Sequence, residues 1–155
     1  MSVRRIPAAR LVWLAATLVL LVGVGFDAQA AEMKLQAFLL WGTDDSQPPA
    51  GKTYKPASPE IRQKLKDLPL KWTNWFEVRR VEAEVPQNAT KAIVISQKCQ
   101  VNVRKLGGRE LEVSLIGKGK EVMRRKQPLP KGELLVLGGN APNSTAWLVV
   151  LKRVQ

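Results

Sequence analysis

Short alternating runs separated by turn residues fill the chain from Trp72 to its C-terminus. In VEAEV (81–85) and ELEVSL (110–115), apolar residues alternate with polar ones at the period of a half-buried strand. Gly107-Gly108, Gly117-Lys118-Gly119 and PLPKG (128–132) divide these runs with turn residues. This spacing predicts a mainly β fold of about seven to eight short strands, either an antiparallel β-sandwich or a partly open barrel.

The expected strands differ in character. The run at 78–81 breaks the alternation by one residue, which predicts a β-bulge. ELLVL (133–137) and WLVVL (147–151) are apolar on both faces, so we expect both in the interior of a sheet. KEVMRRKQ (120–127) is strongly basic, and we expect it at an edge, where charge opposes pairing with other chains.

One helix is expected near the start of the domain. Residues 33–41 are apolar enough for a first strand, and residues 42–58 are a loop rich in Pro, Gly, Ser and Asp. Ser58 can then cap a helix that has Pro59 in its first turn. Ile61, Leu65 and Leu68 share one face, and Pro69 stops the helix. We therefore predict an amphipathic helix over about residues 59–68 and strands between residues 72 and 154.

The first 30 residues resemble an export signal. Three arginines precede an apolar run at residues 11–25, which is shorter than the roughly 20 residues that a membrane-spanning helix needs. Ala28 and Ala30 supply the small residues of a signal-peptidase site. We predict that residues 1–30 are a cleavable secretory signal peptide of bacterial type. The protein is then secreted or periplasmic; alternatively, an uncleaved segment anchors it to the inner membrane. The later apolar runs are too short to span a membrane.

Residues 31–155 would form a single β-rich domain of strongly basic character. The whole chain has a formal net charge of +12, and removing three arginines and one aspartate with the signal leaves +10. Such a charge favours anionic partners such as an acidic polymer or lipid head groups, while the export signal argues against nucleic acid. Cys99 is the single cysteine, so internal disulfides are excluded, and we expect a half-buried thiol on a strand.

The composition removes most catalytic chemistry. The chain contains no histidine, which excludes Ser-His-Asp and Cys-His catalysis and histidine-bound zinc. Gly117-Lys118-Gly119-Lys120 resembles a phosphate-binding loop, but it lies between two expected strands and is more typical of a hairpin turn. Two carboxylate pairs, Glu82 with Glu84 and Glu110 with Glu112, have a spacing that a hydrolase could use, but each also fits a solvated strand face. We expect no enzyme, no cofactor and no metal.

Three features could bind a partner. The segment 98–131 contains ten basic and three acidic residues, and its hairpin offers a candidate anionic-ligand patch consisting of Lys118, Lys120, Arg124, Arg125 and Lys126. Trp72 and Trp75 are candidate aromatic contacts, although on a strand their side chains would point to opposite faces. The loop at 138–145 is the third candidate.

These observations predict an exported, non-catalytic β-domain that serves as a binding or structural accessory in the cell envelope. Its partner would be another exported protein or an envelope polymer. The alternatives are a binder of anionic ligands that uses the basic hairpin edge at 118–126, or a carboxylate-dependent hydrolase.

Overall fold

The computed structural model describes residues 32–140 and 146–155, which contain nine strands and one helix. The predicted signal peptide at 1–30 lies outside these residues, so its cleavage after Ala30 stays a prediction. In chain order the elements are β1 (Met33–Thr43), β2 (Lys55–Pro56), α1 (Pro59–Lys66), β3 (Asn74–Val85), β4 (Thr90–Ser96), β5 (Cys99–Gly107), β6 (Glu110–Gly117), β7 (Lys120–Pro128), β8 (Leu134–Asn140) and β9 (Ala146–Arg153).

The strands form two antiparallel sheets. The five-stranded sheet has the order β2-β3-β1-β9-β8, and the four-stranded sheet has the order β4-β5-β6-β7. The prediction of a mainly β, antiparallel chain with one helix is confirmed. The predicted loop at 42–58 is partly wrong, because Lys55 and Pro56 pair with Glu77 and Phe76 at the edge of the larger sheet. Proline is tolerated in such a short edge strand, since its missing N–H faces away from the ladder.

One apolar cluster takes side chains from both sheets, and we call it the intersheet core. Alternate residues of β1, including Leu35 and Leu39, lie in it with Val101 of β5 and Val113 of β6. The same cluster contains Leu151 of β9, which is fully buried. The period of two in these strands places one whole face of each against this core.

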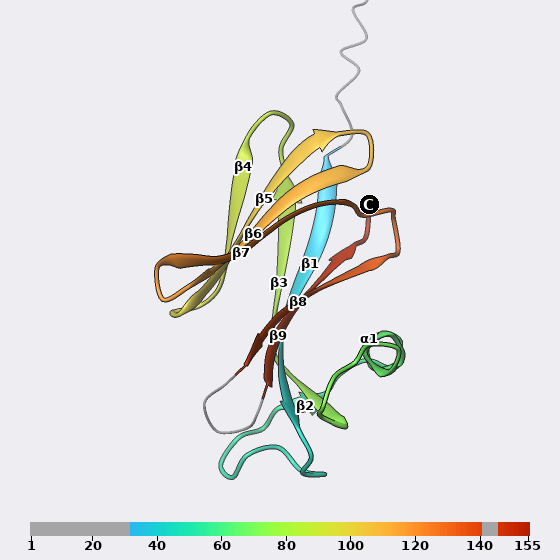
Figure 1. The fold of residues 1–155 in the computed structure, drawn as a ribbon, viewed down its shortest axis with the longest axis vertical. Coiled ribbons are helices and arrows are strands. Elements are labelled where there is room, and N and C mark those ends of the chain that lie inside the picture. Colours follow the sequence, from blue (N-terminus) through green and yellow to red (C-terminus); the bar gives the residue numbers. More distant parts are fainter. Residues whose placement is uncertain (1–31, 141–145) are drawn as a thin grey trace, which may run out of the picture.

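A second apolar cluster covers the other face of the five-stranded sheet, and we call it the helix-side core. Ile61 and Leu65 of α1 pack there against Phe38, Leu40 and other sheet residues. Figure 1 shows α1 set apart from strands β4–β7, on the far side of β8 and β9. The larger sheet is therefore covered on both faces.

The helix forms where the sequence predicts it and is slightly shorter. The Ser58 hydroxyl accepts a hydrogen bond from the Ile61 N–H at 3.4 Å, which satisfies one of the free amides of the first turn. Lys152 of β9 donates to Glu60 at 2.6 Å and ties the helix to the sheet. The helix ends at Lys66 rather than at residue 68, but Leu68 still packs against the helix-side core.

The predicted β-bulge lies at Val78 and is confirmed. Leu39 pairs with Arg79 and Leu40 pairs with Glu77, so Val78 has no partner in β1. Because of the extra residue, the side chains of β3 on the two sides of the bulge alternate between the faces of the sheet in opposite phase. Trp75 is thereby placed opposite Gly42, on the helix side of the sheet.

Two of the three predictions about which strands lie at an edge or in the interior of a sheet are confirmed, and one is wrong. β7 lies at an edge of the four-stranded sheet, as its charge predicts. β9 lies between β1 and β8, also as expected, but the expectation that 133–137 runs through a sheet interior is wrong, because β8 is an edge strand. Leu135 and Leu137 lie in the intersheet core, while Leu134 and Val136 pack on the helix-side core. Apolar cover on both faces therefore does not require a neighbouring strand on both edges.

Among the residues that the structure describes, no helix is long and apolar enough to cross a membrane.

Candidate ligand-binding clefts

The five cations of the predicted anionic-ligand patch are divided between the turn of the β6–β7 hairpin and its two faces. Arg124 pairs with Ser114 and Lys126 pairs with Glu112, on the outer face of the four-stranded sheet. Arg125 pairs with Val113, whose side chain is in the intersheet core, so Arg125 lies on the inner face. Strand alternation thus separates the three consecutive basic residues.

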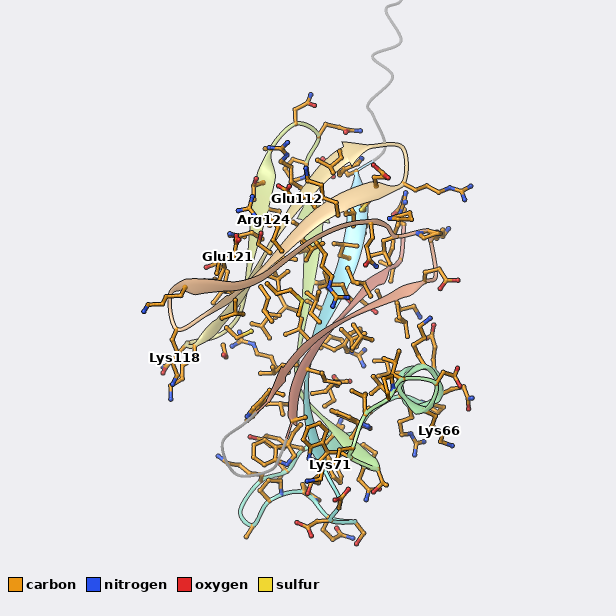
Figure 2. The ribbon with its side chains drawn as sticks, in the orientation of Figure 1. Lys66, Lys71, Glu112, Lys118, Glu121 and Arg124 are labelled. Carbon is orange, nitrogen blue, oxygen red and sulfur yellow. The ribbon has the colours of Figure 1, made fainter. Side chains whose placement is uncertain are left out.

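Acidic side chains accompany the cations of the outer face. Arg124 forms an ion pair with Glu121 at 2.7 Å and lies 3.9 Å from Glu112, and Lys126 lies 3.5 Å from Glu112. The hydrogen bond from Arg124 lowers the pKa of Glu121, and the same bond raises the pKa of Arg124. Figure 2 shows Glu112, Arg124 and Glu121 grouped on this sheet. This face is a mixed ionic surface rather than a purely basic one.

Lys118 lies in the turn of the same hairpin, and Lys120 is the first residue of β7 after it. Lys118 has φ of 49° and Gly119 has φ of 77°, so both turn residues have the positive φ of a type I′ turn. The resemblance to a phosphate-binding loop therefore reflects a hairpin turn, as the sequence predicts. Figure 2 places Lys118 at the tip of the hairpin, away from the group around Arg124.

The two predicted aromatic contacts lie together. Trp75 is 5% exposed in the helix-side core, and the half-buried Trp72 packs against the same cluster. Their ring centroids are 6.2 Å apart with planes at 75°, an edge-to-face arrangement. The expectation of opposite faces is wrong, because Trp72 precedes the first residue of β3 and strand alternation does not apply to it.

Gly42 is required for this packing. A Cβ atom at Gly42 would lie 2.5 Å from the ring of Trp75, closer than real side chains approach. The indole of Trp75 thus occupies space that any other residue at position 42 would fill.

A cleft of about 680 Å³ opens between α1, the segment that follows it and the start of β3. Most of its polar wall comes from α1 and from the residues just before and within β3: Arg62, Gln63, Lys66, Trp72, Thr73 and Asn74. Among the described residues, no aspartate or glutamate lines it. Two cations, an indole ring and side-chain amides can together hold an anionic group and pack against a flat or ring-shaped one.

A smaller cleft of about 290 Å³ shares Trp72 with the first. Arg125 and Met123 reach it from β7, and Leu70, Gly138 and Leu148 contribute to its wall. Arg125 is the single charged residue in the part of this wall that the structure describes. The structure thus brings together Trp72 and Arg125, which belong to separate candidates in the sequence.

Sequence reasoning missed Arg62 and Lys66 as cleft residues. They fall on the polar side of the predicted amphipathic helix, where a solvated position is the ordinary expectation. Their place beside Trp72 depends on how α1 packs against the sheet, which no local pattern records. Figure 2 shows Lys66 and Lys71 at the end of the molecule that holds α1 and β2.

The two carboxylate pairs lie in different sheets. Glu82 accepts a hydrogen bond from Gln36 at 3.0 Å and Glu84 lies 3.5 Å from Lys34, all within the five-stranded sheet. Glu110 and Glu112 belong to the four-stranded sheet, where Glu112 faces Arg124 and Lys126. In residues 32–140 and 146–155, no group of three or more His, Cys, Asp or Glu side chains could hold a metal ion.

Cys99 is a half-buried free thiol on β5, as expected from the sequence. Burial raises its pKa, which disfavours the reactive thiolate. Of the third candidate, the loop at 138–145, residues 138–140 complete β8 and residues 141–145 lie outside the described residues.

Comparison with known proteins gave no match to a family model, a curated protein sequence or a solved structure.

Proposed function

We propose that this protein is an exported, non-catalytic binding domain of the cell envelope, and that it holds an anionic polymer in the two clefts that share Trp72. The observation that carries the proposal is the wall of the larger cleft, where Arg62 and Lys66 stand beside Trp72 and no acid is present among the described lining residues. A carboxylate- or phosphate-bearing polymer offers the negative charge that these side chains attract and leaves the rest of its length for the second cleft.

The charge balance of the molecule supports this site over the outer face of β7. On that outer face, Glu112 and Glu121 offset Arg124 and Lys126, so an incoming anion competes with acids already in place. In the described walls of the clefts, no acidic residue accompanies the lining cations, which are Arg62, Lys66 and Arg125. A net charge of +10 on residues 31–155 adds long-range attraction for the same ligand.

Binding of a polygalacturonate fragment, with neutral dextran as the control polymer, tests the proposal. We expect calorimetry to show binding of the acidic polymer alone, with an affinity that falls as salt rises, because exposed charges are screened. Lys66→Gln should weaken binding about fivefold, the effect of roughly 1 kcal/mol from one charged contact.

Lys64→Gln is the matched control, because it removes the same charge from the same helix turn at a position outside the cleft. Trp72→Phe should reduce affinity without changing the salt dependence. Equal loss from Lys64→Gln and Lys66→Gln would show that net charge, and not the cleft, holds the polymer.

The second candidate site is the basic hairpin edge at 118–126. Arg125→Gln and Arg124→Gln separate it from the clefts, since the two residues are neighbours on opposite faces of β7. The cleft site requires that Arg125→Gln weakens binding more than Arg124→Gln does. Charge reversal at Arg124 and Lys126 that abolishes binding would instead assign the ligand to the hairpin edge.

The export half of the proposal rests on the predicted signal peptide. The intact mass of the protein recovered from fractionated cells tests it. A mass equal to residues 31–155 in the soluble periplasm or medium supports cleavage after Ala30. A full-length mass in the membrane fraction would mean that residues 11–25 remain as an anchor.

For the finer architecture we propose a β-sandwich, open on the side of β7 and β8. The intersheet core supports it, because a single apolar cluster takes side chains from both sheets.

A further inference from the structure

The four strands at the sheet edges differ in how they resist pairing with another strand. β2 has two residues and includes Pro56, and β4 carries Lys91 and loses its register after Val94. β7 carries basic side chains along its length together with Glu121, and it bulges at Val122, which is 61% exposed. Short length, proline, charge and bulges are the usual devices that keep an edge strand unpaired.

β8 has none of these devices. Its sequence LLVLGGN contains no charged residue and no proline, and its pairing with β9 runs from Leu134 to Asn140 without a register shift. Within the described part of the chain, no backbone hydrogen bond joins β8 to an element other than β9. Every second residue of this strand therefore directs both its N–H and its C=O away from the sheet.

β8 is also held rigidly. Leu135 and Leu137 are 3% and 1% exposed in the intersheet core, and Leu134 and Val136 pack on the opposite face. A strand anchored on both faces loses little conformational entropy when a further strand pairs with it, which favours association.

We propose that β8 pairs with β8 of a second copy of this chain, antiparallel about a two-fold axis, to give one continuous ten-stranded sheet. Antiparallel pairing of a strand with itself is the isologous contact of a two-fold dimer. An axis perpendicular to the sheet keeps the faces matched, so Leu134 and Val136 meet apolar residues of the same face.

The absence of charged residues on β8 favours this occupant. A copy of β8 brings no charge into contact with another, whereas the same arrangement at β7 would place Lys and Arg against Lys and Arg. The net charge of +10 still repels two copies at long range, and salt screens that repulsion. Dimerisation should therefore strengthen with salt, while polymer binding in the clefts weakens with salt. The two proposals are thus separable in one titration.

Sedimentation velocity over a concentration series, at low and at moderate salt, tests the dimer. Val136→Lys should weaken dimerisation about tenfold or more, because it places two ammonium groups beside the paired strands. Val122→Lys makes the same change on β7, at an exposed residue, and should leave the dimer within about twofold of the wild-type value.

Hydrogen exchange of the unmodified protein tests the dimer even if the Val136→Lys variant does not fold. In the unmodified protein, exchange of the amides at 134–138 should slow as concentration rises, while exchange at 120–128 stays constant. A monomer at all concentrations, a dimer that Val136→Lys leaves intact while folded, or slowed exchange at β7 instead of β8 would overturn the proposal.

Discussion

β7 and β8 are both edge strands, one in each sheet, but they differ in charge, in regularity and in how deeply their side chains are buried. β7 is charged, bulged and half-buried at most, and its inner face adds only Met123 to the intersheet core as a partly buried contact. β8 is uncharged and regular, and its leucines at 135 and 137 are buried. The difference shows that position at an edge and contribution to the core are independent. β7 is an edge in sequence and in structure, whereas β8 has the sequence of an interior strand at an edge position.

The largest expected difference between β7 and β8 is in how much their core side chains contribute to the free energy of unfolding. Leu137→Ala on β8 should lower the free energy of unfolding by about 3 kcal/mol, because it leaves a cavity in a fully buried site. Met123→Ala on β7 should cost about 1 kcal/mol, since that side chain is only partly buried. Urea denaturation of both variants measures the two values. Equal losses would mean that β7 contributes as much to the core as β8 does.

The turn that leads into β7 should have the next largest effect. Gly119 has φ of 77°, and alanine there should cost about 1–2 kcal/mol because an L side chain disfavours this region. Lys118→Gly at the neighbouring positive φ should be neutral or slightly stabilising. In the Gly119→Ala variant, the amides of β7 should exchange faster, and the exchange rates of the β8 amides should not change. Loosening of β8 as well would show that the two edges are coupled.

A smaller effect is expected from the ionic surface of β7. Glu112→Gln removes an acidic neighbour shared by Arg124 and Lys126 and should cost about 0.5–1 kcal/mol at low salt, with little cost at high salt. Glu133→Gln, at an exposed residue beside β8, is the control and should stay within about 0.5 kcal/mol. A salt-independent loss in Glu112→Gln would indicate a packing role rather than an ionic one.

The smallest expected effect is a change in the pKa of Glu121 on β7. The hydrogen bond from Arg124 lowers the pKa of Glu121 below its ordinary value of 4.5. A carboxyl with a lowered folded-state pKa stabilises the fold above its unfolded-state pKa, and this contribution disappears as pH falls through the folded-state pKa. An NMR titration should show the Glu121 pKa rising toward 4.5 in Arg124→Gln. Amide signals of β8, which has no titratable side chain, should not follow this titration.

Several features of the fold were predictable because their causes are local. Ser58 and Pro59 specify a helix start by the hydrogen bonds and the φ angle that they supply. The positive φ angles at Lys118 and Gly119 follow from the two-residue turn between alternating runs. The extra residue at Val78 interrupts the alternation in the sequence itself, so the residue pattern alone locates the bulge.

The candidate site was less predictable, because it is made of residues from distant segments. Trp72 and Arg125 are separate candidates in the sequence and line one cleft in the structure. Arg62 and Lys66 lie on the polar side of a helix, and their role depends on the docking of α1 beside Trp72. The five-cation patch is divided in the structure, since strand alternation places Arg125 on the opposite face from Arg124 and Lys126 and the register brings Glu112 to Lys126.

By itself the sequence determined most of the strands, their turns, the helix and the basic character of the domain, because hydrophobic period, turn residues and charge act over a few neighbouring positions. Tertiary structure decided the order of the strands, the edge position of β8 and the meeting of Trp72 with Arg125. Strand order depends on which apolar faces pack together across the whole chain. β8 illustrates this physical reason, because burial on both faces looks the same in sequence whether or not a neighbour pairs with the outer edge.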